Sequence, residues 1–219
     1  MAVSIQPARP RGRGRRPMDE VRAEVLQASA AVLFQEGIGG FTIEKVAALA
    51  GASRATIYKY WPSRGALALD GYVDAVGEQI AFRDTGDIRA DLTAVLVAFV
   101  KLMRRKPSGP AFAQLIGAAQ SDAELASAFE EHYFGPRRNE VVALLEAARE
   151  RGQIPPGVQL TTVVDMLWGA CYKRLLLPNL TGTLTEDFAR DVVALTLAGV
   201  TASATAPGTT HDEQEKESH

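Results

Sequence analysis

Residues 41–67, FTIEKVAALAGASRATIYKYWPSRGAL, contain the pattern that decides the fold. Two short helices are predicted here, over about residues 43–50 and 54–60, because each range follows a threonine or serine that can act as an N-cap. Gly51 supplies the turn between the two ranges, and Pro62 ends the second one. Two helices of about eight residues, joined by a three- or four-residue turn that contains glycine, are the signature of a helix-turn-helix.

The apolar residues of this stretch predict which side of each short helix is buried. The second helix carries few of them, so most of its side chains are expected to face solvent. Arginine makes bidentate contacts to guanine, methyl groups touch the thymine methyl, and hydroxyls and helix N-termini donate to phosphates. The pattern therefore predicts a helix that reads nucleic acid. The expected buried anchors are Phe41, Ile43, Val46, Ala47, Leu49, Ala52 and Ile57, and the candidate contact residues are Ser53, Arg54, Ala55, Thr56, Tyr58, Lys59 and Tyr60.

The charge is distributed unevenly along the chain. Residues 1–64 contain ten Lys and Arg against five Asp and Glu, a net charge of +5, whereas the remaining residues carry a net charge of −7. A basic head on an acidic body favours binding of the head to a polyanion, with nucleic acid and an anionic membrane as the two candidates.

Both ends of the chain have compositions typical of disorder. Residues 1–17 hold five arginines and three prolines with almost nothing apolar, and they predict a disordered basic arm. Two interpretations of this arm stay open: insertion into a minor groove beside the helix-turn-helix, or a solubilising tail. Residues 202–219 predict a disordered acidic tail. The arm residues expected to contact DNA are Arg11, Arg13, Arg15 and Arg16.

The remaining sequence predicts helices nearly everywhere and no sheet. Runs rich in Ala, Leu, Glu and Arg alternate with short breaks that contain Gly or Pro, and no segment alternates apolar and polar residues convincingly. The fold class is therefore expected to be all-α. The predicted helices span about residues 19–36, 63–80, 91–105, 112–120, 122–151 with a break near 135–136, 161–177 and 185–201.

Composition and motifs argue against several other classes of protein. With 47% apolar and 23% charged residues, the 219-residue chain is globular in composition, and it has no apolar run of about 20 residues to span a membrane. The single cysteine cannot form an internal disulfide, which favours a cytoplasmic setting. The sequence holds no phosphate-binding loop, no HExxH or GxSxG motif and no cysteine pair, so we expect no enzyme activity, no cofactor and no metal site.

Residues 25–67 resemble the DNA-binding domain of the TetR (tetracycline-repressor-like) family of bacterial transcription regulators. The Phe41-Thr42 entry, the Ala50-Gly51 turn and an exit of the form tyrosine-x-x-aromatic-Pro-Ser-basic over residues 58–64 carry this resemblance. The rest of the chain has a suitable length for the family's second domain but shows no comparable motif.

The resemblance implies an architecture and a role for individual residues. A three-helix helix-turn-helix domain would cover residues 18–64, and a linking helix would join it to a larger helical domain for effector binding and dimerisation over residues 65–201. The sequence departs from the family at Tyr60, where histidine or another aromatic is usual, at Trp61, usually phenylalanine, and at Arg64, usually lysine. The implied base contacts are Arg54, Ala55, Thr56 and Lys59, and the implied contacts to the DNA backbone are Thr42, Tyr58, Tyr60 and Arg64.

Two further sites are expected in the C-terminal domain, with ordinary core packing as the alternative for each. Apolar residues recur every three or four positions on the last two predicted helices, and the resemblance implies that these helices form a four-helix bundle with a second subunit. The expected dimer contacts are Val164, Trp168, Cys171, Leu175, Val192, Leu195, Thr196, Gly199 and Val200. The expected pocket for a small apolar or amphipathic effector is formed by Met103, Phe112, Leu115, Ile116, Phe129, Tyr133, Met166 and Tyr172.

Together these observations predict a sequence-specific DNA-binding transcriptional regulator. The expected mechanism is that of a homodimeric repressor, which leaves a palindromic double-stranded DNA operator when a small-molecule effector binds. An effector-independent DNA-binding or nucleoid-associated protein is the alternative. Trp61 is expected to pack in the core, whereas Lys45 is open between a solvated charge and a phosphate contact.

Overall fold

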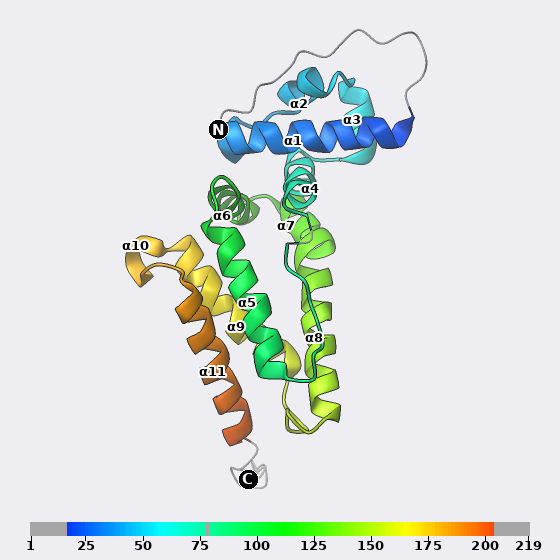
Figure 1. Ribbon diagram of the computed structural model, residues 1–219. Helices are drawn as coiled ribbons and strands as arrows, with labels where there is room; N and C mark the ends of the chain where they lie inside the picture. The colour runs from blue at the N-terminus through cyan, green and yellow to red at the C-terminus, as the bar shows by residue number, and fades with distance from the viewer. Residues whose placement is uncertain (1–16, 78, 204–219) are drawn as a thin grey trace, which may run out of the picture.

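The computed structural model describes residues 17–77 and 79–203, and this part of the chain contains helices and no strands, which confirms the all-α fold class. In chain order the elements are α1 (Met18–Gly40), α2 (Ile43–Ala50), α3 (Arg54–Tyr60), α4 (Arg64–Val76), α5 (Ile88–Arg104), α6 (Ser108–Ala119), α7 (Ala123–Phe129), the π-helical turn η1 (Glu130–Phe134), α8 (Gly135–Glu150), α9 (Leu160–Leu176), α10 (Pro178–Thr181) and α11 (Glu186–Ser203). Figure 1 shows α1 lying across one end of an elongated bundle of the C-terminal helices, with α2 and α3 beside it.

The two short helices begin and end as the sequence predicts. The Thr42 hydroxyl accepts a hydrogen bond from the backbone N–H of Lys45 at 3.3 Å and caps α2, which ends at Gly51 with a φ of 61°. The Ser53 hydroxyl accepts a hydrogen bond from the backbone N–H of Thr56 at 3.1 Å and caps α3. Each cap satisfies an N–H group that the first helical turn leaves without a partner.

Helix α1 is longer than the sequence predicts. It was expected to end at Glu36, and Gly37 does interrupt the helical geometry with a φ of 67° and a ψ of 178°. Beyond this kink the helix resumes as far as Gly40. Within this last turn the backbone N–H of Ile38 donates to the side-chain oxygen of Gln114 at 3.2 Å, which ties the end of α1 to α6.

Helix α4 connects the two parts of the molecule but is shorter than predicted. Ser63 caps it by accepting a 3.0 Å hydrogen bond from the backbone N–H of Ala66. The helix ends at Val76 and not at Ile80, because Gly77 adopts a φ of 56° that an ordinary helix cannot continue through. Helix α4 packs against α1, α6 and α7, so it touches both parts of the molecule.

The other C-terminal helices agree with the prediction in number and order, apart from α10. Asp122 caps α7 by accepting a 3.0 Å hydrogen bond from the backbone N–H of Leu125, and the helical path continues through η1 into α8. The break that was expected near Gly135 and Pro136 is therefore a π-helical turn directly before α8. The sequence analysis did not predict α10, which Pro178 begins from a position where helices tolerate proline.

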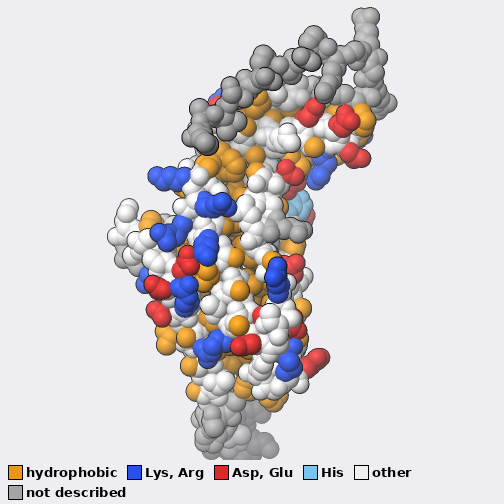
Figure 2. All heavy atoms as spheres, viewed as in Figure 1, with side chains coloured by type: hydrophobic (Ala, Val, Ile, Leu, Met, Phe, Trp, Pro, Cys, Tyr) orange, Lys and Arg blue, Asp and Glu red, His pale blue; other side chains and the backbone are white. Residues whose placement is uncertain are grey.

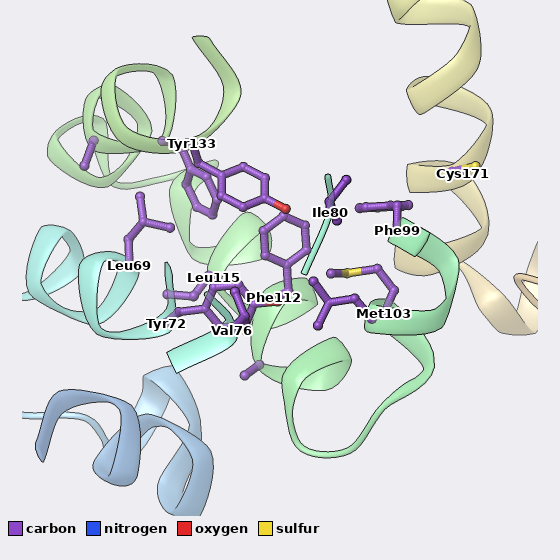
Figure 3. Close-up of a cluster of buried hydrophobic side chains, with 14 of the residues drawn as sticks. Leu69, Tyr72, Val76, Ile80, Phe99, Met103, Phe112, Leu115, Tyr133 and Cys171 are labelled. Atoms are coloured by element: carbon purple, nitrogen blue, oxygen red, sulfur yellow. The ribbon is translucent and has the colours of Figure 1, made fainter. Parts of the chain in front are cut away.

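A continuous hydrophobic core joins the N-terminal helices to the C-terminal ones. Figure 3 shows a part of it, with Tyr72 and Val76 of α4 near Phe112 and Leu115 of α6. The rings of Tyr72 and Phe112 stack with their centroids 5.3 Å apart. Because closely packed side chains transmit displacement, a movement among the C-terminal helices reaches α4 and, through α4, the N-terminal helices.

Gly71 lies where α4 crosses α1 and leaves no space for a side chain. A Cβ atom at this position would lie 2.6 Å from the Cβ atom of Ser29 and 3.0 Å from the backbone nitrogen of Ala30. We therefore expect Gly71→Ala to lower the free energy of unfolding by about 1–3 kcal/mol, measured by chemical denaturation, since the two helices must move apart. Gly117→Ala in α6 is the matched control, because no described atom lies within 4 Å of its added Cβ. Equal losses in the two variants would contradict this account of the crossing.

Candidate nucleic-acid interface

Helix α3 turns most of its side chains toward solvent, as predicted. Tyr58 is 52% exposed and Tyr60 is 40% exposed, an unusual exposure for two neighbouring aromatic residues. Ile57 and Trp61, by contrast, are 0% and 3% exposed and anchor the helix in the core. The outward face therefore combines hydroxyls, positive charges and small apolar groups. It is formed by Ser53, Arg54, Ala55, Tyr58, Lys59 and Tyr60, with Thr56 half-buried beside them.

Leu49 of α2 is exposed, and the prediction that it is a buried anchor was wrong. Its side chain is 55% exposed. The buried residues of α2 are Ile43, Val46, Ala47 and Ala50, which recur at the helical spacing of three and four. Leu49 follows Ile43 by six residues and therefore lies about 120° around the helix from it, outside the buried face.

Arg54 forms an ion pair at the surface with a residue of the preceding helix. Its Nη1 atom donates to the Glu44 carboxylate at 2.9 Å, and the two side chains are 64% and 60% exposed. This hydrogen bond from Arg54 holds the pKa of the Glu44 carboxyl below its ordinary value. Because exposed ion pairs contribute little to stability, the guanidinium can exchange Glu44 for another acceptor at small cost.

Three residues considered for contacts to a DNA backbone have partners within the protein. Thr42 is half-buried and caps α2. Lys45 forms an ion pair with Glu36 of α1 while its side chain stays 46% exposed, so both interpretations, a solvated charge and a phosphate contact, stay open. Arg64 donates through Nη1 to the backbone carbonyl of Phe41 at 3.4 Å. These contacts fix the position of α2 and of the start of α4 beside α1.

Trp61 connects the end of α3 to α4 and to η1. Its indole N–H donates to one oxygen of the Asp70 carboxylate at 2.8 Å, and the other oxygen of that carboxylate lies 2.7 Å from Nδ1 of His132. The burial of Trp61 confirms that it is a core residue. These three side chains form what we call the Trp61–Asp70–His132 relay. The sequence analysis missed it, since 62 residues separate Asp70 from His132 and no local pattern pairs them.

The basic arm and most of the acidic tail lie outside the described residues. This holds for the four arginines predicted to enter a minor groove, which are Arg11, Arg13, Arg15 and Arg16. Their predicted contact with DNA therefore stays a prediction.

Charged side chains are mixed in sign on the face of the C-terminal helices that Figure 2 shows. Lys101 of α5 lies 3.7 Å from the Glu186 carboxylate, and Arg105, directly after α5, donates to the uncharged side chain of Gln79 at 2.8 Å. The Lys101–Glu186 pair therefore offsets one of the positive charges on this face.

The predicted pocket residues come together, with one exception. Phe112 lies at the centre of the cluster, with its ring centroid 4.9 Å from that of Tyr133 and 6.3 Å from that of Tyr172. Met166 is 50% exposed and takes no part in the cluster, because it precedes Tyr172 by six residues and lies on another side of α9. The buried members are Met103, Phe112, Leu115, Phe129 and Tyr133, with Ile116 and Tyr172 half-buried.

The predicted dimer residues divide between the two sides of α9 and α11. Five of them are buried in the protomer, which leaves little of their surface for a partner, so their part in a dimer interface stays a prediction: Val164, Cys171, Val192, Thr196 and Val200. Trp168 and Leu175 are half-buried, whereas Gly199 is exposed and Leu195 is 73% exposed. Both sides of these helices are apolar, so periodicity alone does not tell the core side from the outer one.

The described residues contain neither a membrane-spanning helix nor a metal-binding cluster. No helix among them combines the length and the apolar character that crossing a membrane requires. They also contain no group of three His, Cys, Asp or Glu side chains placed to hold a metal ion.

A short, exposed, donor-rich helix held in a helix-turn-helix defines a DNA-binding protein. Comparison with known families agrees with this class. The model described as "Bacterial regulatory proteins, tetR family" matches residues 25–70, and the model described as "Tetracyclin repressor-like, C-terminal domain" matches residues 82–196. The chain belongs to the TetR family of transcriptional regulators and carries the family's DNA-binding helix-turn-helix domain.

Individual relatives support this assignment along most of the chain. The transcriptional regulator YdeS of Bacillus subtilis is 29% identical over 190 residues, which cover 86% of this chain and 94% of YdeS. The DNA-binding transcriptional repressor TetR of Mycobacteroides abscessus is 30% identical over 76% of this chain and 86% of its own length. The crystal structure of the TetR family transcription regulator SCO0332 is 47% identical, with a TM-score of 0.71 over 86% of this chain and all of that one.

The Trp61–Asp70–His132 relay gives a testable stability difference. Asp70→Asn is expected to lower the free energy of unfolding by about 1–3 kcal/mol, because the carboxylate accepts from both neighbours and an amide replaces one oxygen with a donor. Chemical denaturation followed by tryptophan fluorescence measures the change and reports on the environment of Trp61. Asp74→Asn, one turn further along α4 and exposed, is the control and should stay within about 0.5 kcal/mol of wild type. If Asp74→Asn lowers the free energy of unfolding as much as Asp70→Asn does, the hydrogen bonds of the relay contribute no more to stability than an exposed carboxylate.

Proposed function

We propose that this chain is a homodimeric repressor that reads a palindromic operator with residues 53–60 and releases it when a small molecule binds the C-terminal domain. The observation that carries the proposal is the exposed face of α3, whose seven residues are anchored only through the buried Ile57 and Trp61. The name of the Mycobacteroides abscessus relative, a transcriptional repressor, supports repression as the mode of action.

The dimensions of α3 suit the major groove. An α-helix with its side chains is about 10–12 Å in diameter, which fits a groove about 12 Å wide. Arg54 stands at the N-terminal end of this helix, where side chains reach base edges in helix-turn-helix proteins, and its exposed guanidinium suits a guanine. Tyr58 and Tyr60 present exposed hydroxyls that suit phosphate oxygens on either side. Ala55 and the Thr56 methyl suit the thymine methyl.

An apolar surface suited to a second copy runs along α9 and α11. On α11 it contains Leu195 and Gly199, with exposed alanines at positions 194, 198 and 202 that keep the same helical spacing. On α9 it contains Met166 and Gly169, and Met166 lines a groove together with Gly199. Small residues allow helices from two protomers to approach closely. A dimer formed here would present two reading helices, as two half-sites about 34–36 Å apart require.

The aromatic cluster is the proposed place for the effector. Two solved structures of the same fold are named for responses to small molecules: the flavonoid-responsive regulator FrrA, 18% identical, and the regulator FadR from Bacillus subtilis in complex with stearoyl-CoA, 17% identical. In this chain Tyr72 belongs both to the cluster and to α4, and α4 also carries Asp70 of the relay to Trp61. A ligand that enlarges the cluster would displace α4 and with it α3. Such a ligand shifts the population only if it binds the released state more tightly.

The role of Arg54 in base reading gives the first test of this function. Arg54→Ala is expected to lower the binding free energy by about 1–3 kcal/mol on a duplex that the wild-type chain binds, and to relax the preference at one base position. Mobility shifts on a set of single-base variants measure both effects. Arg89→Ala, an exposed arginine at the start of α5, is the control and should bind as wild type. Unchanged affinity and preference in Arg54→Ala would remove this residue from base reading.

The dimer surface gives a second test. Leu195→Glu is expected to yield monomers at micromolar concentration, because it places a charge at the most exposed large apolar residue of the described chain. Light scattering coupled to size-exclusion chromatography measures the mass. Leu49→Glu makes the same change at an exposed leucine of α2 and should leave the dimer intact. A Leu195→Glu protein that stays dimeric would place the interface elsewhere.

A further inference from the structure

Two buried tyrosines in the aromatic cluster have no visible partner for their hydroxyls. Tyr72 is 0% exposed and Tyr133 is 1% exposed, and neither hydroxyl oxygen has a hydrogen-bond partner among the described residues. Figure 3 shows the hydroxyl of Tyr133 pointing from η1 into the middle of the cluster. An unsatisfied buried hydroxyl costs about 1–3 kcal/mol, and phenylalanine would fill the same space without that cost. The two hydroxyls therefore remain available to a partner that is not part of the protein.

A cation without a counter-charge lies beside these hydroxyls. The guanidinium carbon of Arg137 lies 3.9 Å from the ring centroid of Tyr133. The Nε atom of Arg137 is buried, and it has no hydrogen-bond partner in the part of the chain that the structure describes. A half-buried charge of this kind is unfavourable unless a charge of opposite sign joins it. Because Arg137 forms no ion pair with the described residues, it remains available to an anionic ligand.

The phenols beside Arg137 act as hydrogen-bond donors at neutral pH. Burial raises the pKa of Tyr133 to about 12, in spite of the nearby guanidinium, which acts in the opposite direction. Burial raises the pKa of Tyr72 and of Tyr172 as well. Protonated phenols and a guanidinium supply N–H and O–H groups, so this side of the cluster offers donors to an oxygen atom of a ligand.

A small cavity opens beside Arg137, between α8 and α9. Its volume is about 90 Å³, and its walls include the rings of Phe134, Trp168 and Tyr172. Pockets for small molecules commonly have volumes of about 300–1,000 Å³, so this cavity holds part of a ligand, about one ring. Phe134 and Trp168 are half-buried, so this side of the cavity lies near the surface.

Three other charged side chains lie at or beside this cavity, and their formal charges sum to −1. Arg138 is paired with Glu130 through two hydrogen bonds, of 2.9 and 3.2 Å. Asp165 also lines the cavity, and its side chain is exposed to solvent. Because Arg138 is paired with Glu130, Arg137 is the guanidinium of the cavity that remains for a ligand, and a single guanidinium suits a single planar anion.

We propose that the effector of this protein is an aromatic carboxylate, with its ring between Phe134, Trp168 and Tyr172 and its carboxylate on Arg137 and the Tyr133 hydroxyl. This inference rests on the proposed function, which makes the aromatic cluster the effector site. Flat aromatic walls favour a ring over an alkyl chain, and a bidentate guanidinium favours a carboxylate. Tyr133 directly follows His132 in η1, so a ligand that draws Tyr133 toward it also acts on the Trp61–Asp70–His132 relay.

Calorimetric titration of the full-length protein with three probes tests the class of ligand. We expect 2-naphthoate to bind at least about tenfold more tightly than either of the other two probes. Methyl 2-naphthoate lacks the negative charge, and decanoate lacks the aromatic ring. Equal binding of the ester would overturn the role of the anion. Tighter binding of decanoate would overturn the aromatic class, and no binding of 2-naphthoate would overturn the proposal as a whole.

Two arginine variants test the assignment to residues. Arg137→Gln is expected to weaken 2-naphthoate binding about tenfold while leaving binding of the methyl ester unchanged. Arg89→Gln is the control and should leave both constants near wild type, because Arg89 is exposed at the start of α5 and does not line the cavity. Tyr133→Phe should also weaken 2-naphthoate binding selectively, and its thermal midpoint should equal or exceed that of wild type if the hydroxyl has no partner in the free protein. Equal losses in the two arginine variants would overturn the assignment.

Operator release is measured in a separate experiment. The proposed ligand class and the proposed repressor function can then be contradicted independently of each other. Fluorescence anisotropy of a labelled duplex, with 2-naphthoate added to the complex, reports release. Selective binding of 2-naphthoate without release would support the ligand class and contradict the proposed effector mechanism. If the protein binds the duplex but does not bind 2-naphthoate, the proposed ligand class is overturned. The proposal that the protein reads DNA is then left intact.

Discussion

The position of Trp61 is the constraint on which the rest of the structure depends. Helix α3 has seven residues, too few to be stable by itself, and it contributes one buried side chain, Ile57, to the core. Its orientation therefore depends on what holds its two ends. Ser53 caps the start, and the buried indole of Trp61, bonded to Asp70, fixes the end. Exposed donors on the outer face are useful for reading DNA only because these contacts hold the helix rigidly.

The same contacts make α3 sensitive to the C-terminal domain. Asp70 is bonded to His132 of η1, and α4 shares the hydrophobic core with α6 and α7. A second hydrogen bond joins α1 to α6 through Ile38 and Gln114, and the hydroxyl of Ser29 in α1 donates to the backbone carbonyl of Leu67 in α4 at 2.8 Å. The N-terminal helices are thus tied to the C-terminal domain at several points. Displacement of α4 by a ligand in the aromatic cluster would turn the reading head as one body.

The helix-turn-helix was predictable because its caps and turn depend on residues close together in the sequence. Contacts between residues far apart in the sequence were not predictable. Thr42, Gly51 and Ser53 act within three or four residues of themselves, so the sequence predicts both short helices closely. Helix α5 begins at Ile88 and not near Asp91, because Asp87 is its N-cap, while Asp91 is buried and accepts hydrogen bonds from Thr85. Two acidic residues four positions apart are equally plausible caps from sequence alone.

The residues of the candidate sites were also predictable only where local sequence determines their position. The aromatic cluster was largely predicted, because large apolar residues are buried in most folds, but Met166 was not distinguishable from them by type. On α9 and α11 the apolar pattern continues around both sides of the helix, so the sequence does not distinguish buried positions such as Cys171 and Val192 from exposed ones such as Leu195. The unpaired Arg137 and the relay through Asp70 depend on distances that no sequence pattern encodes.

Selection of bound sequences from a pool of random DNA duplexes tests the central claim, that α3 is an exposed helix held in place to read bases, most directly. Our account predicts that the full-length protein enriches one palindromic sequence, with half-sites whose centres are about 10 base pairs apart or a multiple of that spacing. A pool that remains random after repeated selection, although the protein retains DNA, would contradict base reading by α3. Enrichment of a single asymmetric half-site would contradict the paired reading heads.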